Sequence, residues 1–166
     1  MANGNGRLKS PYKRLPRGAF SFCYTTYMKL KIKKLRPEAV LPQFALEKDS
    51  GIDMFACGAQ TLQPGELKKI STGVSIQLPP DHAGLIWDKS SVGSKGLKVF
   101  CGVFDEEYRG EYFMVIKNFT DAPYTFEHGQ KVAQMLIQKI ERPEIVEVDE
   151  LDTTVRGEGG FGSTGK

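Results

Sequence analysis

Residues 102–110 (GVFDEEYRG) place three consecutive acids behind an apolar run, with Tyr108 and Arg109 just before a glycine. A carboxylate fixed at the end of a strand, such as that of Asp105, can accept a proton from a bound water molecule. The same pattern also fits the solvated acidic turn of a hairpin. The segment alone therefore predicts either a general base at the edge of a cleft or a surface turn.

A second segment, 88–96 (DKSSVGSKG), combines Lys89 with the hydroxyls of Ser90 and Ser91 and with nearby glycines. Ammonium, hydroxyl and backbone N–H groups are donors that suit phosphate oxygens. The spacing differs from that of the GxxxxGK[ST] phosphate loop. A phosphate-binding loop and an ordinary polar loop are both compatible with this segment.

Two polar residues interrupt apolar segments. Asp53 follows Gly51 within a strand-like run, and Gln134 is the polar interruption in 129–137 (GQKVAQMLI). A carboxylate inside an apolar run needs a cation or a hydrogen-bond donor as a partner. A turn-forming aspartate and a satisfied core amide would explain the same two residues without any site.

The end of the chain is rich in glycine, with five glycines between Arg156 and Lys166. Arg156 can pair with a phosphate, and glycine backbones can wrap an anion with their N–H groups. The ring of Phe161 can stack on a nucleobase. On its own, a glycine-rich tail that buries no core is expected to be mobile.

The elements that must position these residues are predicted to be short β-strands. Apolar and polar residues alternate with a period of two in several runs, which Gly and Pro turn signals separate. The predicted strands cover residues 28–34, 74–78, 83–87, 97–104, 111–119 and 132–137. Helical patterning is nearly absent, except for one short turn region at 90–95. This organisation favours an all-β fold, namely a compact β-barrel of the jelly-roll type.

With 166 residues, the chain is long enough for one domain with a real core. Residues 1–27 are predicted to be a basic, disordered N-terminal extension, because they carry scattered cations and two prolines without periodicity. A targeting or nucleic-acid-binding tail is the alternative reading of that segment. The barrel domain is expected at 28–148, followed by a C-terminal arm at 149–166.

Charge and cysteine content argue against several classes of function. Ten of the 23 Lys and Arg residues, but none of the 20 Asp and Glu residues, lie in 1–36. The body is therefore acidic, and nucleic acid is not expected as a partner. Cys23, Cys57 and Cys101 are widely spaced without a CxxC pair, which argues against disulfides and zinc and favours a reducing compartment such as the cytoplasm. No apolar run approaches the ~20 residues of a membrane span.

Taken in order, the segments resemble the five signature motifs of the homotrimeric deoxyuridine triphosphatase (dUTPase) family. The matching segments are 51–53, 89–91, 102–110, 129–137 and 156–165. The resemblance runs from about residue 28 to residue 166, and five motifs in one order are far more specific than any one of them. Lys89 and Lys131 stand where the family often has arginine, and Ser91 stands where glycine is more common. Lysine keeps the charge but lacks the bidentate fork of arginine.

The resemblance implies an Mg²⁺-dependent enzyme that hydrolyses dUTP to dUMP and pyrophosphate on a distorted jelly-roll barrel. Asp105 is then the base that deprotonates the water attacking the α-phosphorus, and Gln134 helps to place that water or an α-phosphate oxygen. Mg²⁺ bridges the triphosphate, and Asp53 supports the ion through water. Family members are homotrimers in which a neighbour's arm closes each site, so a homotrimer with shared sites is implied.

The resemblance also implies the contacts with dUTP. Main-chain groups near Gly102 and Val103 would read uracil, and Tyr108 would pack under the deoxyribose without room for a 2′-hydroxyl. On the arm, Phe161 would cap the uracil and Arg156 would reach the γ-phosphate. The implied substrate-binding residues are Lys89, Ser90, Ser91, Gly102, Val103, Tyr108, Arg156, Phe161, Gly162, Ser163 and Thr164.

Two other functions stay open on the sequence. The first is deamination of dCTP on the same fold, alone or together with dUTP hydrolysis, and it would need a different acid–base arrangement around the nucleobase. The second is a non-catalytic nucleotide-binding regulator, with which the basic extension and Lys89 are compatible. The presence of Asp105, Tyr108 and the Phe161 tail together favours hydrolysis.

Overall fold

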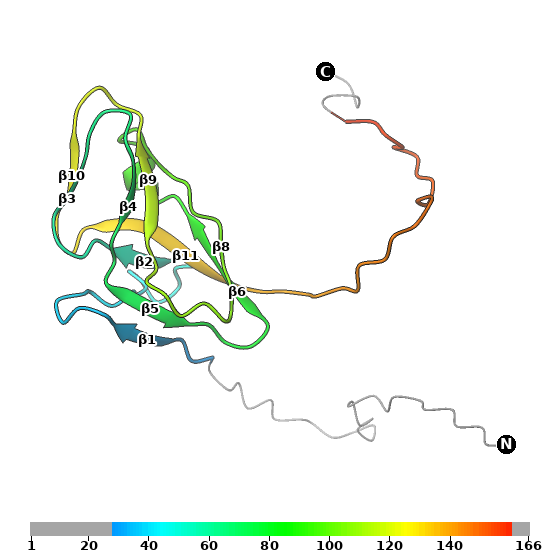
Figure 1. Ribbon diagram of the computed structural model, residues 1–166, viewed down its shortest axis with the longest axis horizontal. Coiled ribbons are helices and arrows are strands. Elements are labelled where there is room, and N and C mark those ends of the chain that lie inside the picture. Colours follow the sequence, from blue (N-terminus) through cyan, green and yellow to red (C-terminus); the bar gives the residue numbers. More distant parts are fainter. Residues whose placement is uncertain (1–27, 161–166) are drawn as a thin grey trace.

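The computed structural model describes residues 28–160, which form short β-strands and one helical turn (Figure 1). The elements are β1 (Lys31–Lys34), β2 (Ile52–Phe55), β3 (Gln60–Leu62), β4 (Leu67–Ile70), β5 (Val74–Gln77), β6 (His82–Trp87), α1 (Ser90–Gly93), β7 (Leu97–Val99), β8 (Val103–Phe104), β9 (Met114–Asn118), β10 (Tyr124–Phe126) and β11 (Lys131–Lys139). All strand pairs are antiparallel, which suits strands joined by short turns.

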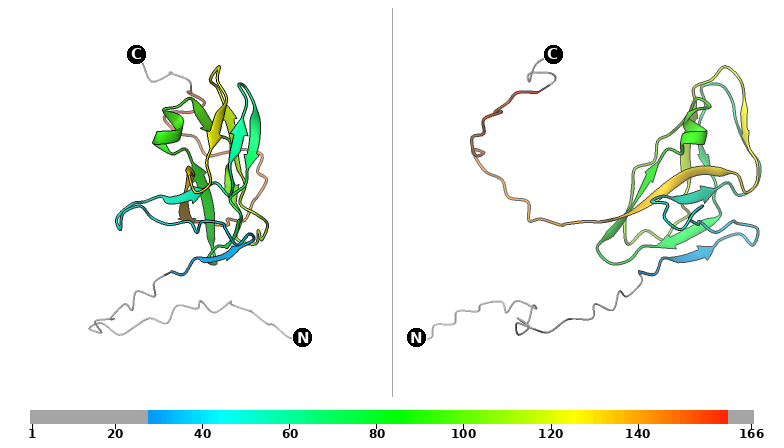
Figure 2. Two further views of the ribbon diagram at one scale, coloured as in Figure 1. Left: turned by 90° about the vertical axis from the view of Figure 1, so that its left-hand side faces the viewer. Right: turned by 180° about the vertical axis from the view of Figure 1, so that it is seen from behind.

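The strands form four small sheets around one core. The largest sheet has the strand order β2–β11–β6–β8, and a second has the order β4–β9–β7. The other two sheets are the pairs β1–β5 and β3–β10. Figures 1 and 2 show the four sheets gathered into one body, from which the segment after β11 departs. The predicted all-β class is confirmed, and the architecture agrees with a jelly roll.

Alternate positions of the strands fill the core. In β9, Met114, Ile116 and Asn118 are buried while Val115 and Lys117 are partly exposed, as the period of two of a half-buried strand requires. The buried cluster also contains Met54, Ile70, Ile76, Phe126 and Met135. This interior fixes β2, β6 and β11, the strands that carry most of the candidate site.

The run 97–104, predicted as one strand, is divided between two sheets. The first half, β7, pairs with β9, and the second half, β8, pairs with β6. The N–H of Phe100 still donates to the carbonyl of Val115 (2.8 Å), whereas the carbonyl of Gly102 accepts from the N–H of Ile86 (3.1 Å). The single-strand prediction is wrong, because a period-two pattern does not reveal that a chain changes sheets in the middle of an apolar run.

Helix is confined to a single turn. Between residues 28 and 160 the only helix is α1, which lies where the sequence predicts a short turn region at 90–95. No helix in this part of the chain has the length and apolar character needed to cross a membrane. Strands and loops therefore position the catalytic candidates.

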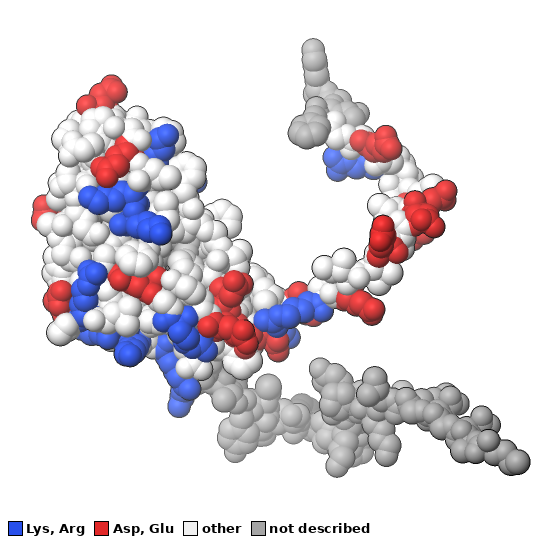
Figure 3. Space-filling view, in the orientation of Figure 1, with Lys and Arg blue, Asp and Glu red and all other residues white. Residues whose placement is uncertain are grey.

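Beyond β11 the chain leaves the body. Residues 140–160 contain no helix or strand. Ile140 and Arg142 still contact Asp81 of the body, and Figures 1 and 2 show the chain after them running outward as an extended segment. Figure 3 shows acidic side chains along this segment, while its apolar side chains Ile145, Leu151 and Val155 are almost fully exposed. The boundary expected at residue 148 stays a prediction, and residues 1–27 and 161–166 lie outside the described part.

Candidate active site

A buried carboxylate that binds two lysines lies at the centre of the candidate site. Asp53 is on β2, directly opposite Gln134 of β11, and is only 2% exposed. Its Oδ1 lies 2.7 Å from Nζ of Lys89, and its Oδ2 lies 2.6 Å from Nζ of Lys131. The partner that a carboxylate inside a strand needs is therefore a pair of ammonium groups.

The two lysines also decide the ionisation of Asp53. Burial on its own would raise the pKa of this carboxyl. The hydrogen bonds and positive charges of Lys131 and Lys89 act in the opposite direction and prevail, so the pKa lies below its ordinary value of 3.8. Two cations against one anion leave a positive excess, which suits an anionic ligand.

The phosphate-binding candidates follow β6 and lead into α1. The carbonyl of Lys89 accepts hydrogen bonds from the N–H groups of Val92 (2.8 Å) and Gly93 (2.9 Å), which turn the chain directly after the lysine. Lys89, Ser90 and Gln134 line one hollow of about 640 Å³. The structure thus brings together a cation, a hydroxyl and an amide, while Ser91 is exposed on the helical turn.

Gln134 is held from two sides. Its Nε2 donates to the carbonyl of Asp88 (2.9 Å), while its Oε1 lies over Gly51. A Cβ at Gly51 would approach Oε1 to 2.5 Å, so a side chain at this position would displace the amide from its place. Asp88 itself ties the loop to β7, because its Oδ1 accepts from the N–H of Val99 (2.8 Å). It also pairs with Lys98.

The sequence does not single out Asp88 as a positioning residue. The only available signal is an aspartate immediately before the Lys-Ser-Ser segment, a position from which a short acidic side chain can bond to nearby backbone. Its main-chain partner, the N–H of Val99, lies on another strand, and the sequence gives no indication of that pairing.

Asp105 lies at a second hollow. It follows β8 and is exposed, and its carbonyl accepts from the N–H of Tyr108 (3.1 Å) in a turn. This hollow, of about 750 Å³, is also lined by Arg142. Arg142 pairs with Glu106 (3.0 Å) and with Asp81 (2.7 Å), and the hydrogen bond to Glu106 is the main reason why its pKa is raised.

Aromatic rings support the Asp105 turn. The ring of Tyr108 lies 5.6 Å from the rings of Phe104 and Tyr112, and the latter two stack at 4.1 Å. Tyr112 is fully buried, and this burial is the main cause that raises its pKa to about 12, so it stays neutral. Tyr108 is partly exposed and is therefore the ring of this cluster that a ligand can contact.

The main-chain groups predicted to read uracil lie between the two hollows. Gly102 and Val103 border a smaller hollow of about 310 Å³, together with the exposed ring of Trp87. The carbonyl of Gly102 already accepts a hydrogen bond from Ile86 (3.1 Å). Nearby, the sulfur of Cys101 accepts from the N–H of Val115 (3.0 Å), and burial raises the pKa of this thiol.

A single chain does not bring the predicted catalytic residues together. The hollow at Gln134 and the hollow at Asp105 share no lining residue. Gln134 is opposite Trp87 on β6, whereas Phe104, just before Asp105, is opposite Gly84. Three residues of strand separate these two points, or ~10 Å, which is beyond hydrogen-bond reach.

The arm is also apart from both hollows. Arg156 lies on the outward segment, where its Nε donates to the carbonyl of Gly159 (2.7 Å). Phe161, Gly162, Ser163 and Thr164 lie outside the described residues. Arg156 is not among the residues that line the hollow at Lys89 or the hollow at Asp105.

No metal cage is visible among residues 28–160, where no group of three or more His, Cys, Asp or Glu side chains could hold an ion. Asp53 is predicted to support Mg²⁺ through water. In the structure its two carboxylate oxygens each pair with a lysine, Lys89 and Lys131. Mg²⁺ usually keeps several waters and takes one or two carboxylates together with substrate phosphates. The residues present therefore fit an ion that is held mainly by a phosphate ligand.

Comparison with known proteins identifies relatives over most of the chain. A family model described as dUTPase matches residues 37–165. The deoxyuridine 5'-triphosphate nucleotidohydrolase of Clostridium kluyveri is 42% identical over 141 residues, which cover 83% of this chain and 99% of that protein. The protein of the same name from Gloeothece citriformis is 40% identical over 141 residues, covering 83% and 97%.

Solved structures agree with this match. The dUTPase of Staphylococcus bacteriophage 80alpha with dUPNHPP has a TM-score of 0.78 at 30% identity, and the similarity covers 83% of this chain and 99% of that one. A mutant dUTPase from phage phi11 of S. aureus, whose structure concerns the coordination of a structural Mg(II) ion, has a TM-score of 0.69 at 28% identity. That similarity covers 74% of this chain and 97% of that one.

Proposed function

The chain belongs to the dUTPase family, and from this membership we propose that it hydrolyses dUTP to dUMP and pyrophosphate. The observation that carries the proposal is the placement of Lys89 and Lys131 around the buried Asp53, next to Gln134. Ammonium and hydroxyl donors fixed at one hollow suit a triphosphate. Such donors also do not need to reorganise when the ligand arrives, which is how enzymes stabilise developing charge.

The proposal includes a homotrimer in which each site is shared. A base at Asp105 and an amide at Gln134 act on one water only if they lie within hydrogen-bond reach of it. Two hollows on one subunit do not meet this requirement, whereas facing hollows of two subunits do. The outward segment with its exposed Ile145 and Leu151 is suited to cover a neighbouring subunit, since apolar side chains on an extended segment gain free energy by burial.

The reaction is an attack of water on the α-phosphorus. The carboxylate of Asp105 accepts a proton from this water while the water oxygen bonds to phosphorus. The bond from the α-phosphorus to the oxygen shared with the β-phosphate then breaks, and pyrophosphate leaves with dUMP as the second product. Gln134, held by Asp88, directs its Oε1 at the water or its amide at an α-phosphate oxygen.

Selectivity for dUTP comes from the segment at the small hollow. Main-chain groups of Gly102 and Val103 offer uracil a donor and an acceptor, and cytosine presents the reverse pattern. A buried polar group left unsatisfied costs about 1–3 kcal/mol. Tyr108 packs under the deoxyribose and excludes a 2′-hydroxyl.

Lys89, Ser90 and Ser91 bind the phosphates, and the arm completes the site with Arg156 at the γ-phosphate. Phe161 caps the uracil, and Gly162, Ser163 and Thr164 contact the nucleotide. Closure of the arm excludes water and strengthens the charge contacts inside. Asp53 would support a bound Mg²⁺ through water, and the ion would supply positive charge that reduces the repulsion between the phosphates and the attacking water.

The experiment that tests this function is a pyrophosphate-release assay with dUTP, dCTP, dTTP, dATP, dGTP and UTP, each with and without Mg²⁺. We expect release from dUTP only, and only with the metal. Release of ammonia from dCTP would instead support a deaminase. Tight binding of dUTP without turnover in the presence of Mg²⁺ would support a regulator and contradict the proposal.

A further inference from the structure

We propose that Glu111 is a positioning residue for sugar selectivity, because it holds the Tyr108 ring in the orientation that excludes a ribose. This inference rests on the proposed dUTPase function and on the role of Tyr108 in it. Glu111 lies just after the motif that contains Asp105 and Tyr108, and nothing in the sequence marks it as part of the site.

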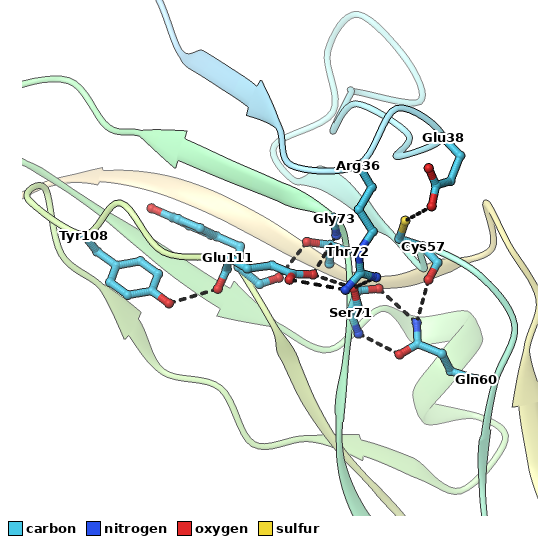
Figure 4. Close-up of polar contacts among 10 residues, drawn as sticks. Arg36, Glu38, Cys57, Gln60, Ser71, Thr72, Gly73, Tyr108 and Glu111 are labelled. Atoms are coloured by element: carbon cyan, nitrogen blue, oxygen red, sulfur yellow. Dashed lines mark hydrogen bonds and ion pairs between the residues drawn. The ribbon is translucent and has the colours of Figure 1, made fainter.

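The Glu111 side chain is fixed to the corner between β4 and β5. Its Oε1 accepts hydrogen bonds from the hydroxyl of Ser71 and from the N–H of Gly73 (2.8 Å). The guanidinium of Arg36 lies 3.8 Å from Oε2 and donates to Oγ of Ser71 (2.7 Å). Figure 4 shows the carboxylate of Glu111 pointing into this corner, and its side chain is only 12% exposed.

The corner itself is closely packed around Gly73. Gly73 has φ +68, and a Cβ there would lie 2.8 Å from the sulfur of Cys57 and 2.9 Å from Cβ of Ala39. Thr72 also links this corner to the segment that follows Glu111, since its hydroxyl donates to the carbonyl of Tyr112 (2.7 Å). Glu111 is thus bound to a closely packed and hydrogen-bonded corner of the body.

The main chain of Glu111 is bonded to Tyr108, so the corner also restricts the position of the Tyr108 ring. The Tyr108 hydroxyl donates to the carbonyl of Glu111 (3.0 Å), as Figure 4 shows. The ring lies against Gly110, where a Cβ would collide with the hydroxyl oxygen. The glycine leaves room for the ring, and the Glu111 carbonyl fixes its outer end. If the side chain of Glu111 loses its corner partners, the peptide at 110–111 can shift and the ring shifts with it.

Exclusion of a 2′-hydroxyl depends on the ring position at the scale of one atom. A misplacement of about 1 Å can change rates by up to about a hundredfold. We therefore expect Glu111→Ala to raise the ratio of kcat/KM for UTP to that for dUTP by about tenfold. Glu111→Gln keeps an acceptor for Gly73, so it should retain most of the selectivity.

The test compares kcat and KM for dUTP and UTP in wild type, Glu111→Ala, Glu111→Gln and Glu66→Ala. Glu66 is a matched control, because its carboxylate also caps a backbone N–H, that of Gln63 (2.7 Å), in a turn remote from Tyr108. Relaxed selectivity in Glu111→Ala, with recovery in Glu111→Gln and no change in Glu66→Ala, supports the inference. If folded Glu111→Ala has the wild-type ratio of kcat/KM for UTP to that for dUTP, the inference is overturned. A residue that only stabilises the fold would lower stability without changing this ratio.

Two further measurements keep the outcome decisive. If Glu111→Ala does not fold, Ser71→Ala removes one corner partner and should still raise the ratio, and an unchanged ratio there overturns the inference. Tyr108→Phe keeps the ring but loses the bond to Glu111, so it should relax selectivity in the same direction. Wild type that fails to hydrolyse dUTP would contradict the proposed function itself, whereas selective wild type with equally selective variants would contradict only the role of Glu111.

Discussion

Nζ of Lys89 lies 2.7 Å from Oδ1 of Asp53, so the cation expected at the phosphates is already held by a buried carboxylate. Lys131 occupies the other oxygen at 2.6 Å. This arrangement answers the question raised by lysine at two positions where arginine is usual in the family. A lysine lacks a rigid fork, but a carboxylate shared by two lysines restricts where both ammonium groups can go.

Asp53→Asn should lower the free energy of unfolding by about 2 kcal/mol at pH 7, since hydrogen bonds to charged groups contribute in this range. The pKa of Asp53 is lowered in the folded protein, so its contribution is present above the unfolded value near 3.8 and is lost as pH falls through the folded value. Urea unfolding at one protein concentration should therefore show a difference in unfolding free energy between wild type and variant. This difference should decrease as the pH falls below about 3.8. The exposed Asp121 provides a control, Asp121→Asn, and a gap that stays constant from pH 7 to pH 3 would contradict the assignment.

Asp105→Asn should lower kcat by at least about a hundredfold, because it removes the group that accepts the proton from water. Binding of dUTP, followed by calorimetry, should change little. Glu107→Gln is a suitable control, since Glu107 is a neighbouring exposed acid. Turnover of Asp105→Asn close to that of wild type would rule out its role as the base.

Gly51→Ala should reduce kcat through Gln134, because the new Cβ would approach Oε1 to 2.5 Å and displace the amide. The expected loss is about tenfold to a hundredfold, as for other small misplacements of a catalytic group. A double-mutant cycle with Gln134→Ala shows whether the loss in kcat acts through Gln134. If the effect acts through Gln134, the double variant is no slower than Gln134→Ala alone, whereas additive losses would indicate a separate effect.

Much of the fold is predictable from local patterns. The alternation in 74–78 corresponds to β5, and the apolar run 132–137 corresponds to the centre of β11. The period of two reports which face of a strand is buried, and this information is local. Sheet partners are set by contacts between distant residues, so the division of 97–104 between two sheets is not visible in the pattern.

The sequence likewise indicates some residues of the candidate site and not others. Asp53 and Gln134 stand out because they are polar residues inside apolar runs, and the structure places them opposite each other. Asp88 and Glu111 do not stand out, since an acid in a loop is ordinary and the sequence does not show that their carboxylates accept from the N–H groups of Val99 and Gly73. The separation of Asp105 from Gln134 is likewise a property of the sheet register and not of the sequence.

Deletion of residues 156–166 should abolish most turnover while the barrel stays folded. The last strand of the body ends at Lys139, and the outward segment has no strand or helix up to residue 160. Its removal should leave the core contacts intact. Pyrophosphate release measures the loss of turnover, and thermal unfolding monitored by circular dichroism checks that the barrel stays folded. A truncated domain that melts at ambient temperature would contradict the role of the arm as a lid.

Mixed assemblies of two variants test the central claim of the proposal, which is that the subunits of a homotrimer share each site, with Asp105 from one subunit and Lys89 from another. Asp105→Asn and Lys89→Ala should each have little activity alone. If the two variants are co-refolded in equal amounts, random assembly should restore about a quarter of the wild-type rate of pyrophosphate release from dUTP, because one in four pairings has both residues intact. A mixture no more active than the separate variants would contradict the shared site.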